Sequence, residues 1–169
     1  DVGPANLDFN GKTITITDVL WNHDGTYVNP GPGKITADAT GSTLNYPCII
    51  NGLVMGSYNN SIIDNLIISN TSGVSYLWGP VNVRNLTINS GGGSFGANGQ
   101  AVNVSGTWTN NGTFTHGDNT VTFNGAADGS ITGSNSTTFY NLTINKDAST
   151  NKVTLLKNTS VTNNLTMTT

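Results

Sequence analysis

The sequence predicts an all-β fold, a single-domain parallel β-solenoid, and three observations lead to this prediction. First, charged residues make up only 9% of the 169 residues, and all nine acidic residues are Asp. Second, strong helix formers are scarce, whereas β-branched residues and turn formers dominate. Third, short apolar runs alternate with turns, and one four-residue pattern recurs. We therefore expect a right-handed β-helix with short strands, coils of about 20 residues and essentially no helix.

The recurring pattern consists of Asn, Leu, a variable position that is mostly Thr, and an apolar residue. Its four copies begin at Asn65, Asn85, Asn141 and Asn164. The first two copies begin 20 residues apart and the last two 23 apart, whereas 56 residues separate Asn85 from Asn141. We interpret this longer gap as about three coils. Stacked coils would place equivalent residues about 4.8 Å apart.

Stacking in register predicts inward columns and a ladder of amides. Alternation along each strand directs the Leu and the final apolar residue inward and the residue between them outward. The predicted inward columns are Leu66, Leu86, Leu142 and Leu165, and Ile68, Ile88, Ile144 and Met167. The four Asn residues would stand at a bend, where their amides can bond from coil to coil. Asp64 and Arg84, which precede two of them, are predicted to form a stacked ion pair.

One domain is expected for a chain of this length, with two parts of different regularity. Residues 48–169 would form the regular coils. Residues 1–47 are less repetitive and rich in turns, and would form a cap or an assembly surface. They include an alternating segment that predicts a possible assembly strand, made of Thr13, Ile14, Thr15, Ile16 and Thr17.

Three segments carry a resemblance to a known class of proteins. They are residues 107–117 (TWTNNGTFTHG), 119–125 (NTVTFNG) and 139–146 (FYNLTINK). They resemble the repeats of large secreted surface proteins of bacteria and archaea, of the filamentous-haemagglutinin-like or pectate-lyase-like parallel β-helix type. The resemblance covers residues 60–169 and implies a cell-surface structural or adhesive role. It brings no catalytic residues with it.

Charge and hydropathy argue against two classes of partner. The net charge is −3, and the six basic residues are spread along the chain, so no nucleic-acid partner is expected. No apolar run approaches the ~20 residues of a membrane span. A start at Asp1 fits a secreted chain whose signal peptide has been removed, or a start chosen for expression. We expect an extracellular or cell-surface location, with the single Cys48 buried as an inert thiol.

No catalytic, cofactor-binding or metal-binding residues are predicted. Polysaccharide-active β-helices need clustered carboxylates and a base, whereas this chain offers only Asp64 beside Arg84, a pair more typical of a surface ion pair. His23 and His116 lie 93 residues apart in turn-rich segments, so we interpret them as exposed turn residues.

Two features of the sequence bear on glycans, namely glycosylation sequons and aromatic residues. The chain has nine N-glycosylation sequons, against about six expected from composition. Three of them belong to the predicted amide ladder and are expected to stay unmodified. The possible N-glycosylation sites are Asn59, Asn70, Asn103, Asn111, Asn135 and Asn158. Among the aromatic residues, Trp78 is the best candidate for a sugar platform, whereas Trp108 and Phe114 alternate as core residues do.

These features favour a structural subunit of an extracellular filament, pilus-like fibre or sheath. It would assemble head-to-tail with copies of itself through open solenoid ends. The alternative is a fragment of a large secreted adhesin whose flank binds surface glycans or a host surface. A polysaccharide-active β-helix enzyme is the third hypothesis, although we expect no enzyme.

Overall fold

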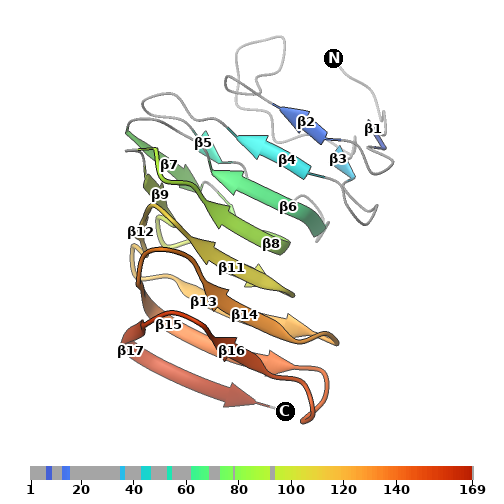
Figure 1. The fold of residues 1–169 in the computed structure, drawn as a ribbon, viewed down its shortest axis with the longest axis vertical. Helices are drawn as coiled ribbons and strands as arrows, with labels where there is room; N and C mark the ends of the chain where they lie inside the picture. Colours follow the sequence, from blue (N-terminus) through green and yellow to red (C-terminus); the bar gives the residue numbers. More distant parts are fainter. Residues whose placement is uncertain are drawn as a thin grey trace.

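The computed structural model shows a parallel β-solenoid of about five turns (Figure 1). It describes residues 7–8, 13–15, 35–36, 43–46, 53–54, 62–68, 73–77, 79–91 and 94–168. Side chains are described for residues 62, 65–68, 73–77, 79–91 and 94–168. The described residues contain no helix, and their strands pair in parallel. The predicted fold class is therefore confirmed.

The strands are short, as expected from closely spaced turns, and most contain two to eight residues. They are β1 (Leu7–Asp8), β2 (Thr13–Thr15), β3 (Ile35–Thr36), β4 (Thr43–Tyr46), β5 (Leu53–Val54), β6 (Ile62–Ile68), β7 (Val74–Leu77), β8 (Val81–Ile88), β9 (Ser94–Gly96), β10 (Val102–Val104), β11 (Thr107–Asn110), β12 (Thr113–Thr115), β13 (Thr120–Gly125), β14 (Gly129–Thr132), β15 (Thr137–Lys146), β16 (Val153–Leu155) and β17 (Thr159–Thr168).

Each coil has three sides. Side 1 consists of residues 62–63 of β6, residues 81–83 of β8, β10, β13, residues 141–146 of β15 and residues 164–168 of β17. Side 2 consists of β2, β4, residues 65–68 of β6, residues 85–88 of β8, β11, β14 and β16. Side 3 consists of β5, β7, β9 and β12, followed by residues 137–139 of β15 and 159–161 of β17. The long strands thus run across a bend and contribute to two sides.

Side 2 carries the longest continuous register in the described residues. One column of register positions on it reads Ile14, Leu44, Leu66, Leu86, Trp108, Ile131 and Leu155. From Leu66 onward the members are 20, 22, 23 and 24 residues apart, so the coils lengthen along the chain. Because β4 pairs with β6, the sheet also continues across the expected boundary at residue 48.

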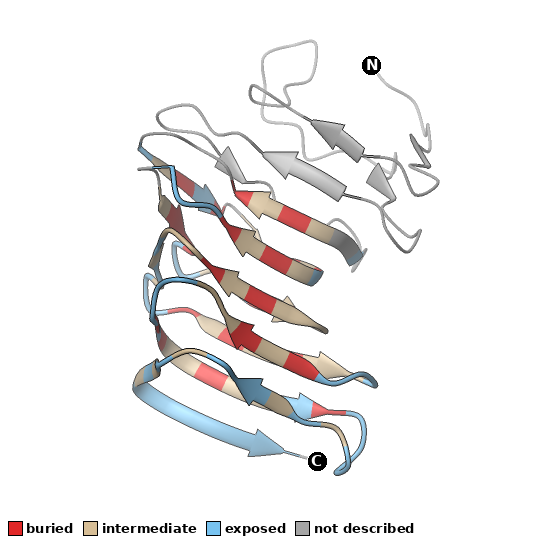
Figure 2. Cartoon of the chain, in the orientation of Figure 1, coloured by how far each residue is buried: buried red, intermediate tan, exposed pale blue. Residues whose placement is uncertain are grey.

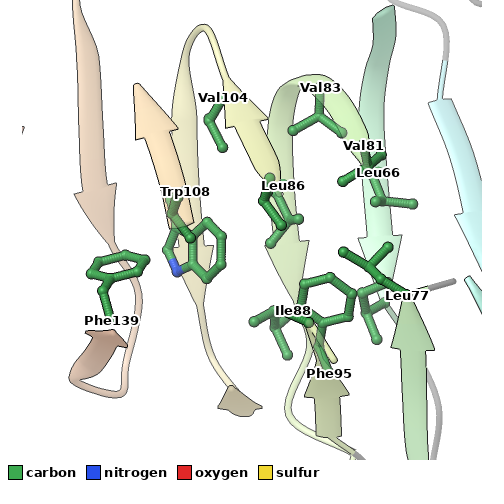
Figure 3. Packing of buried hydrophobic residues seen from close by; sticks show 14 of the residues in the cluster. Leu66, Leu77, Val81, Val83, Leu86, Ile88, Phe95, Val104, Trp108 and Phe139 are labelled. Atoms are coloured by element: carbon green, nitrogen blue, oxygen red, sulfur yellow. The ribbon is translucent and has the colours of Figure 1, made fainter. Parts of the chain in front are cut away.

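The core lies between the three sides. Alternation along the strands makes Leu66, Ile68, Leu86 and Ile88 fully or almost fully buried (Figure 3). Burying a side chain of this size contributes about 1.5–3 kcal/mol relative to leaving it in water. The short strands therefore gain most of their stability from the neighbouring coil.

Aromatic side chains fill the middle of this core. Trp108 packs edge-on against Phe114 and Phe139, with ring centroids 4.8 and 5.2 Å apart. Phe95 stacks on Phe114 at 5.8 Å, and so links the aromatic group to the coil above. The buried indole Nε1 of Trp108 has no hydrogen-bond acceptor and lies on the side of Phe139 (Figure 3). An N–H beside an aromatic ring makes a weak substitute for that bond.

The predicted columns are wrong in one respect, because the four repeat copies do not share one side. Leu66 and Leu86 stand on side 2, where Trp108 follows Leu86. Leu142 stands on side 1, between Val121 and Leu165. Both sides need apolar residues at alternating positions, so the same pattern suits either of them. The gap of 56 residues is not a whole number of coils.

The bend between sides 2 and 3 is held by a buried amide. Asn110 donates from Nδ2 to the Ser136 carbonyl at 3.0 Å and to Thr137 Oγ1 at 3.2 Å. Its Oδ1 accepts from the Gly112 amide at 3.2 Å. Gly133 lies beside it with φ +123°, where a Cβ would collide with the Asn110 carbonyl oxygen.

Candidate assembly surfaces

The lower end of the solenoid lies near the C label of Figure 1, and large apolar side chains are exposed there. Leu165 and Met167 of β17 are in register with Leu142 and Ile144, and so point the same way along their strand. Leu142 is 4% exposed, whereas Leu165 and Met167 are 60% and 76% exposed. Figure 2 shows this change as buried positions in the middle strands and an exposed β17. The inward direction predicted for these two residues therefore does not bring burial.

The lower end of side 2 also exposes apolar side chains. Leu155 of β16 continues the column of Trp108 and Ile131, yet it is 58% exposed, and the adjacent Leu156 is 65% exposed. Within the described residues, β16 pairs only with β14 and β17 only with β15. One edge of each strand thus keeps backbone groups that another parallel strand could satisfy.

The upper end of side 2 is formed by the predicted assembly strand. Thr13, Ile14 and Thr15 form β2, which pairs in parallel with β4. In the described part of the chain, β4 is the one strand that pairs with β2. Ile16 and Thr17 lie outside the described residues. Ile14 and Leu155 occupy opposite ends of one register column.

The predicted Asn ladder forms between its first two members, Asn65 and Asn85. Asn85 Nδ2 donates to Asn65 Oδ1 at 3.0 Å, and Asn85 Oδ1 accepts from the Thr107 amide at 3.0 Å. The ladder stops there, because Gly106 and Thr107 occupy the next coil at this bend.

The lower pair of the predicted ladder needs a correction. Asn141 and Asn164 are partners in the backbone register, but Asn141 Oδ1 accepts from Nδ2 of Asn163, at 2.8 Å. The cause is a register shift that places one more residue in β17 between the partners of Phe139 and Asn141. Asn141 itself donates to Thr120 Oγ1 at 3.2 Å.

The backbone register places the two segments of the predicted ion pair side by side in neighbouring coils, which we call adjacent rungs. Ile63 pairs with Val83 and Asn65 with Asn85, so Asp64 and Arg84 lie on adjacent rungs. The side chain of Asp64 lies outside the described residues, and the ion pair stays a prediction. Arg84 is exposed at the bend between sides 1 and 2.

Lys146 forms a clamp that the sequence did not predict. Its side chain is only 4% exposed, and Nζ donates to the carbonyl oxygens of Ser105, at 3.1 Å, and of Asn124. These residues belong to three successive coils. Burial lowers the pKa of Lys146, opposed by the nearby charges of Asp147 and Asp128.

Several possible glycosylation sites already use their amides in the fold. Asn103 Nδ2 donates to Asn82 Oδ1 at 2.8 Å, and Asn135 Nδ2 donates to the Gly112 carbonyl at 2.7 Å. Asn111 accepts through Oδ1 from the Ser134 amide, and Asn158 is exposed. A glycan on Asn103 or Asn135 would remove a donor hydrogen from the bond. Modification stays a prediction for all four.

Other predicted features lie outside the described residues or lack a chemical arrangement. Asn59, Asn70, Cys48, His23 and Trp78 are outside them. His116 Nδ1 stands 3.7 Å from Asp118 Oδ1 in a turn, and the described residues hold no group of three or more potential metal ligands. In the part of the chain that the structure describes, no helical segment has the length and apolar character that a membrane crossing requires.

The Asn82–Asn103 pair was not predicted from the sequence. Each of these residues stands between two Val residues in the segments Val81–Val83 and Val102–Val104, and the repeated Val-Asn-Val could have revealed their stacking. Comparison of the chain with protein-family models, with curated proteins and with solved structures finds no match.

Proposed function

We propose that this chain is a structural repeat unit of an extracellular or cell-surface filament, fibre or sheath, which stacks head-to-tail with copies of itself. The proposal includes a relationship to surface repeats of the filamentous-haemagglutinin-like or pectate-lyase-like β-helix type. One observation carries it: β2 and β16, the first and last strands of side 2 among the described residues, belong to the same register.

The chemistry of the two edges is compatible with stacking. A second copy would place β2 beside β16, both as parallel strands, and would set Ile14 one rung below Leu155. The polar position that precedes each of these two residues matches as well, because Thr13 and Thr154 share the neighbouring column. A stack would therefore extend the core and the outer face together.

The exposed apolar residues give the contact a driving force. Leu155, Leu165 and Met167 are each more than half exposed, and covering such side chains contributes about 1–2 kcal/mol each. Pairing of the edge strands adds backbone hydrogen bonds along the same contact. The contact is heterologous, and a heterologous contact whose rotation does not close a ring produces a filament.

The test is light scattering after gel filtration, together with electron microscopy, on the 169-residue chain over a range of concentrations. We expect elongated assemblies that grow with concentration. Leu155→Lys combined with Leu165→Lys should give dispersed monomers, because two charges would have to be buried in the contact. Ser160→Lys is the matched control, since Ser160 is an exposed outward residue of β17 on side 3 and should not interfere. Monomers of the unchanged chain at every concentration, or assembly of the double variant, would contradict the proposal.

A further inference from the structure

The outer surface of side 1 forms a regular array of short, uncharged polar side chains. We call it the neutral face. Its central column is Asn82, Asn103, Thr122, Thr143 and Thr166, and the exposed, apolar Ile62 precedes Asn82 in the same column. Two flanking columns are Thr120, Asn141 and Asn164, and Asn124, Asn145 and Thr168. Its members are partly or fully exposed, and they alternate with core residues such as Val121 and Leu142.

Hydrogen bonds between rungs fix six of the eleven side chains of the neutral face. Asn103 bonds to Asn82 at 2.8 Å, and Thr168 Oγ1 donates to Asn145 Oδ1 at 2.9 Å. The Asn141–Thr120 bond adds a third link. Little rotamer entropy therefore remains to be lost when another surface covers these residues.

The composition of the neutral face restricts its partner. None of its members is charged or aromatic, so it offers neither an ion-binding patch nor a stacking platform for sugar rings. Side chains this short allow a second sheet to approach closely, and β-branched residues and stacked amides are typical of dry contacts between paired sheets. A partner must present a similarly regular, uncharged surface.

We propose that the neutral face pairs with the neutral face of a second copy of this chain. A second copy has the same rung spacing of about 4.8 Å, so a favourable contact at one rung can recur at the others. Like faces also meet without charge repulsion, because neither carries a charge. The result would be lateral pairing, with two solenoids lying side by side.

The size of the face determines when this pairing occurs. Five rungs and three columns cover about 300 Å², whereas a stable interface needs about 800 Å² per partner. One pair of single copies is therefore too weak to persist. Head-to-tail stacks add this area with each copy, so filaments should pair laterally once about three copies are stacked. The inference thus rests on the proposed function.

The test compares assembled fibres of the unchanged chain with those of Thr143→Lys. Thr143 lies at the centre of the neutral face, so like charges would meet across the contact at every copy. The matched control is Thr138→Lys, which places the same charge on an exposed strand position of side 3. Circular dichroism checks that both variants fold. Electron microscopy then measures whether fibres are single or paired.

We expect paired fibres for the unchanged chain and for Thr138→Lys, and single fibres for Thr143→Lys. About 1 M salt, which shortens screening to about 3 Å, should restore pairing of Thr143→Lys. Single fibres of the unchanged chain, or equal pairing of Thr143→Lys at low salt, would overturn the lateral pairing and leave the filament proposal standing. Absence of any fibre from the unchanged chain would overturn both.

Discussion

The middle coils and the lowest coil use nearly the same residues with opposite results. Leu142 is 4% exposed and its register partner Leu165 is 60% exposed, while Ile131 is fully buried and its partner Leu155 is 58% exposed. The alternating pattern decides only the direction of a side chain. Burial comes from the coil on either side, as expected for a stack in which each unit contacts only its neighbours.

The largest effect is expected at the aromatic centre of the middle coils. Trp108→Ala removes a fully buried side chain that contacts Phe114 and Phe139, and should reduce the free energy of unfolding by about 3–5 kcal/mol. Leu155→Ala, at the exposed end of the same column, should change it by less than about 1 kcal/mol. Urea denaturation followed by circular dichroism measures both, and equal losses would remove the distinction between middle and end.

The same contrast in stability is expected for two Leu residues of one column on side 1, Leu142 and Leu165. Leu142→Ala should cost about 2–4 kcal/mol, because the cavity lies between two coils. The identical change at Leu165 should cost under about 1 kcal/mol in the monomer. Measurement at concentrations where assemblies form should reveal an additional cost at Leu165, since stacking would bury it. A cost at Leu165 that is independent of concentration would speak against an open end.

Polar residues should show the same contrast at a smaller scale. Asn110→Ala removes a buried amide with three hydrogen bonds, leaving the Ser136 carbonyl and the Gly112 amide without this partner, and should cost about 1–3 kcal/mol. Asn145→Ala is the control, because Asn145 is exposed and accepts a hydrogen bond from the Thr168 hydroxyl at the surface. Its cost should stay below about 0.5 kcal/mol, and thermal unfolding compares the two.

The smallest expected effect is a pH dependence from Lys146. Burial lowers its pKa in the folded chain, so between that pKa and the unfolded value near 10.4 the unfolded state binds more protons. Stability should therefore rise with pH across this alkaline window and fall as pH decreases through it. Lys146→Met should abolish this rise, whereas Lys152→Met, at an exposed position, should keep it. A rise that persists in Lys146→Met would assign it to other groups.

Much of the architecture was accessible from the sequence, because alternation and turn residues determine strands and their directions. Trp108 was predicted to be a core residue and is fully buried. The side of the coil on which each repeat copy lies could not be predicted from the sequence, because Leu86 and Leu142 satisfy the same local pattern on different sides. Only the summed lengths of the bends decide which side a copy joins, and the coils between them vary in length.

The candidate assembly surfaces were predictable in part. An alternating strand at residues 13–15 and an apolar pair at Leu165 and Met167 are visible in the sequence. The shared column of Ile14 and Leu155 is not, because it depends on every register step between them. Asn163, rather than the predicted Asn164, makes the amide contact with Asn141. This likewise depends on a register shift that cannot be predicted from the residue types.

The most direct measurement of head-to-tail stacking is a crosslink between the two edges. In a chain with Cys48→Ala, the changes Thr13→Cys and Thr154→Cys would place thiols one rung apart in adjacent copies. Their Cα atoms would be about 4.8 Å apart, within the range of a disulfide. The control pairs Thr13→Cys with Thr109→Cys on a middle rung of the same side. Oxidation should give a ladder of covalent oligomers on a non-reducing gel for the first pair and none for the second; monomers alone, or identical ladders from both, would contradict stacking through these edges.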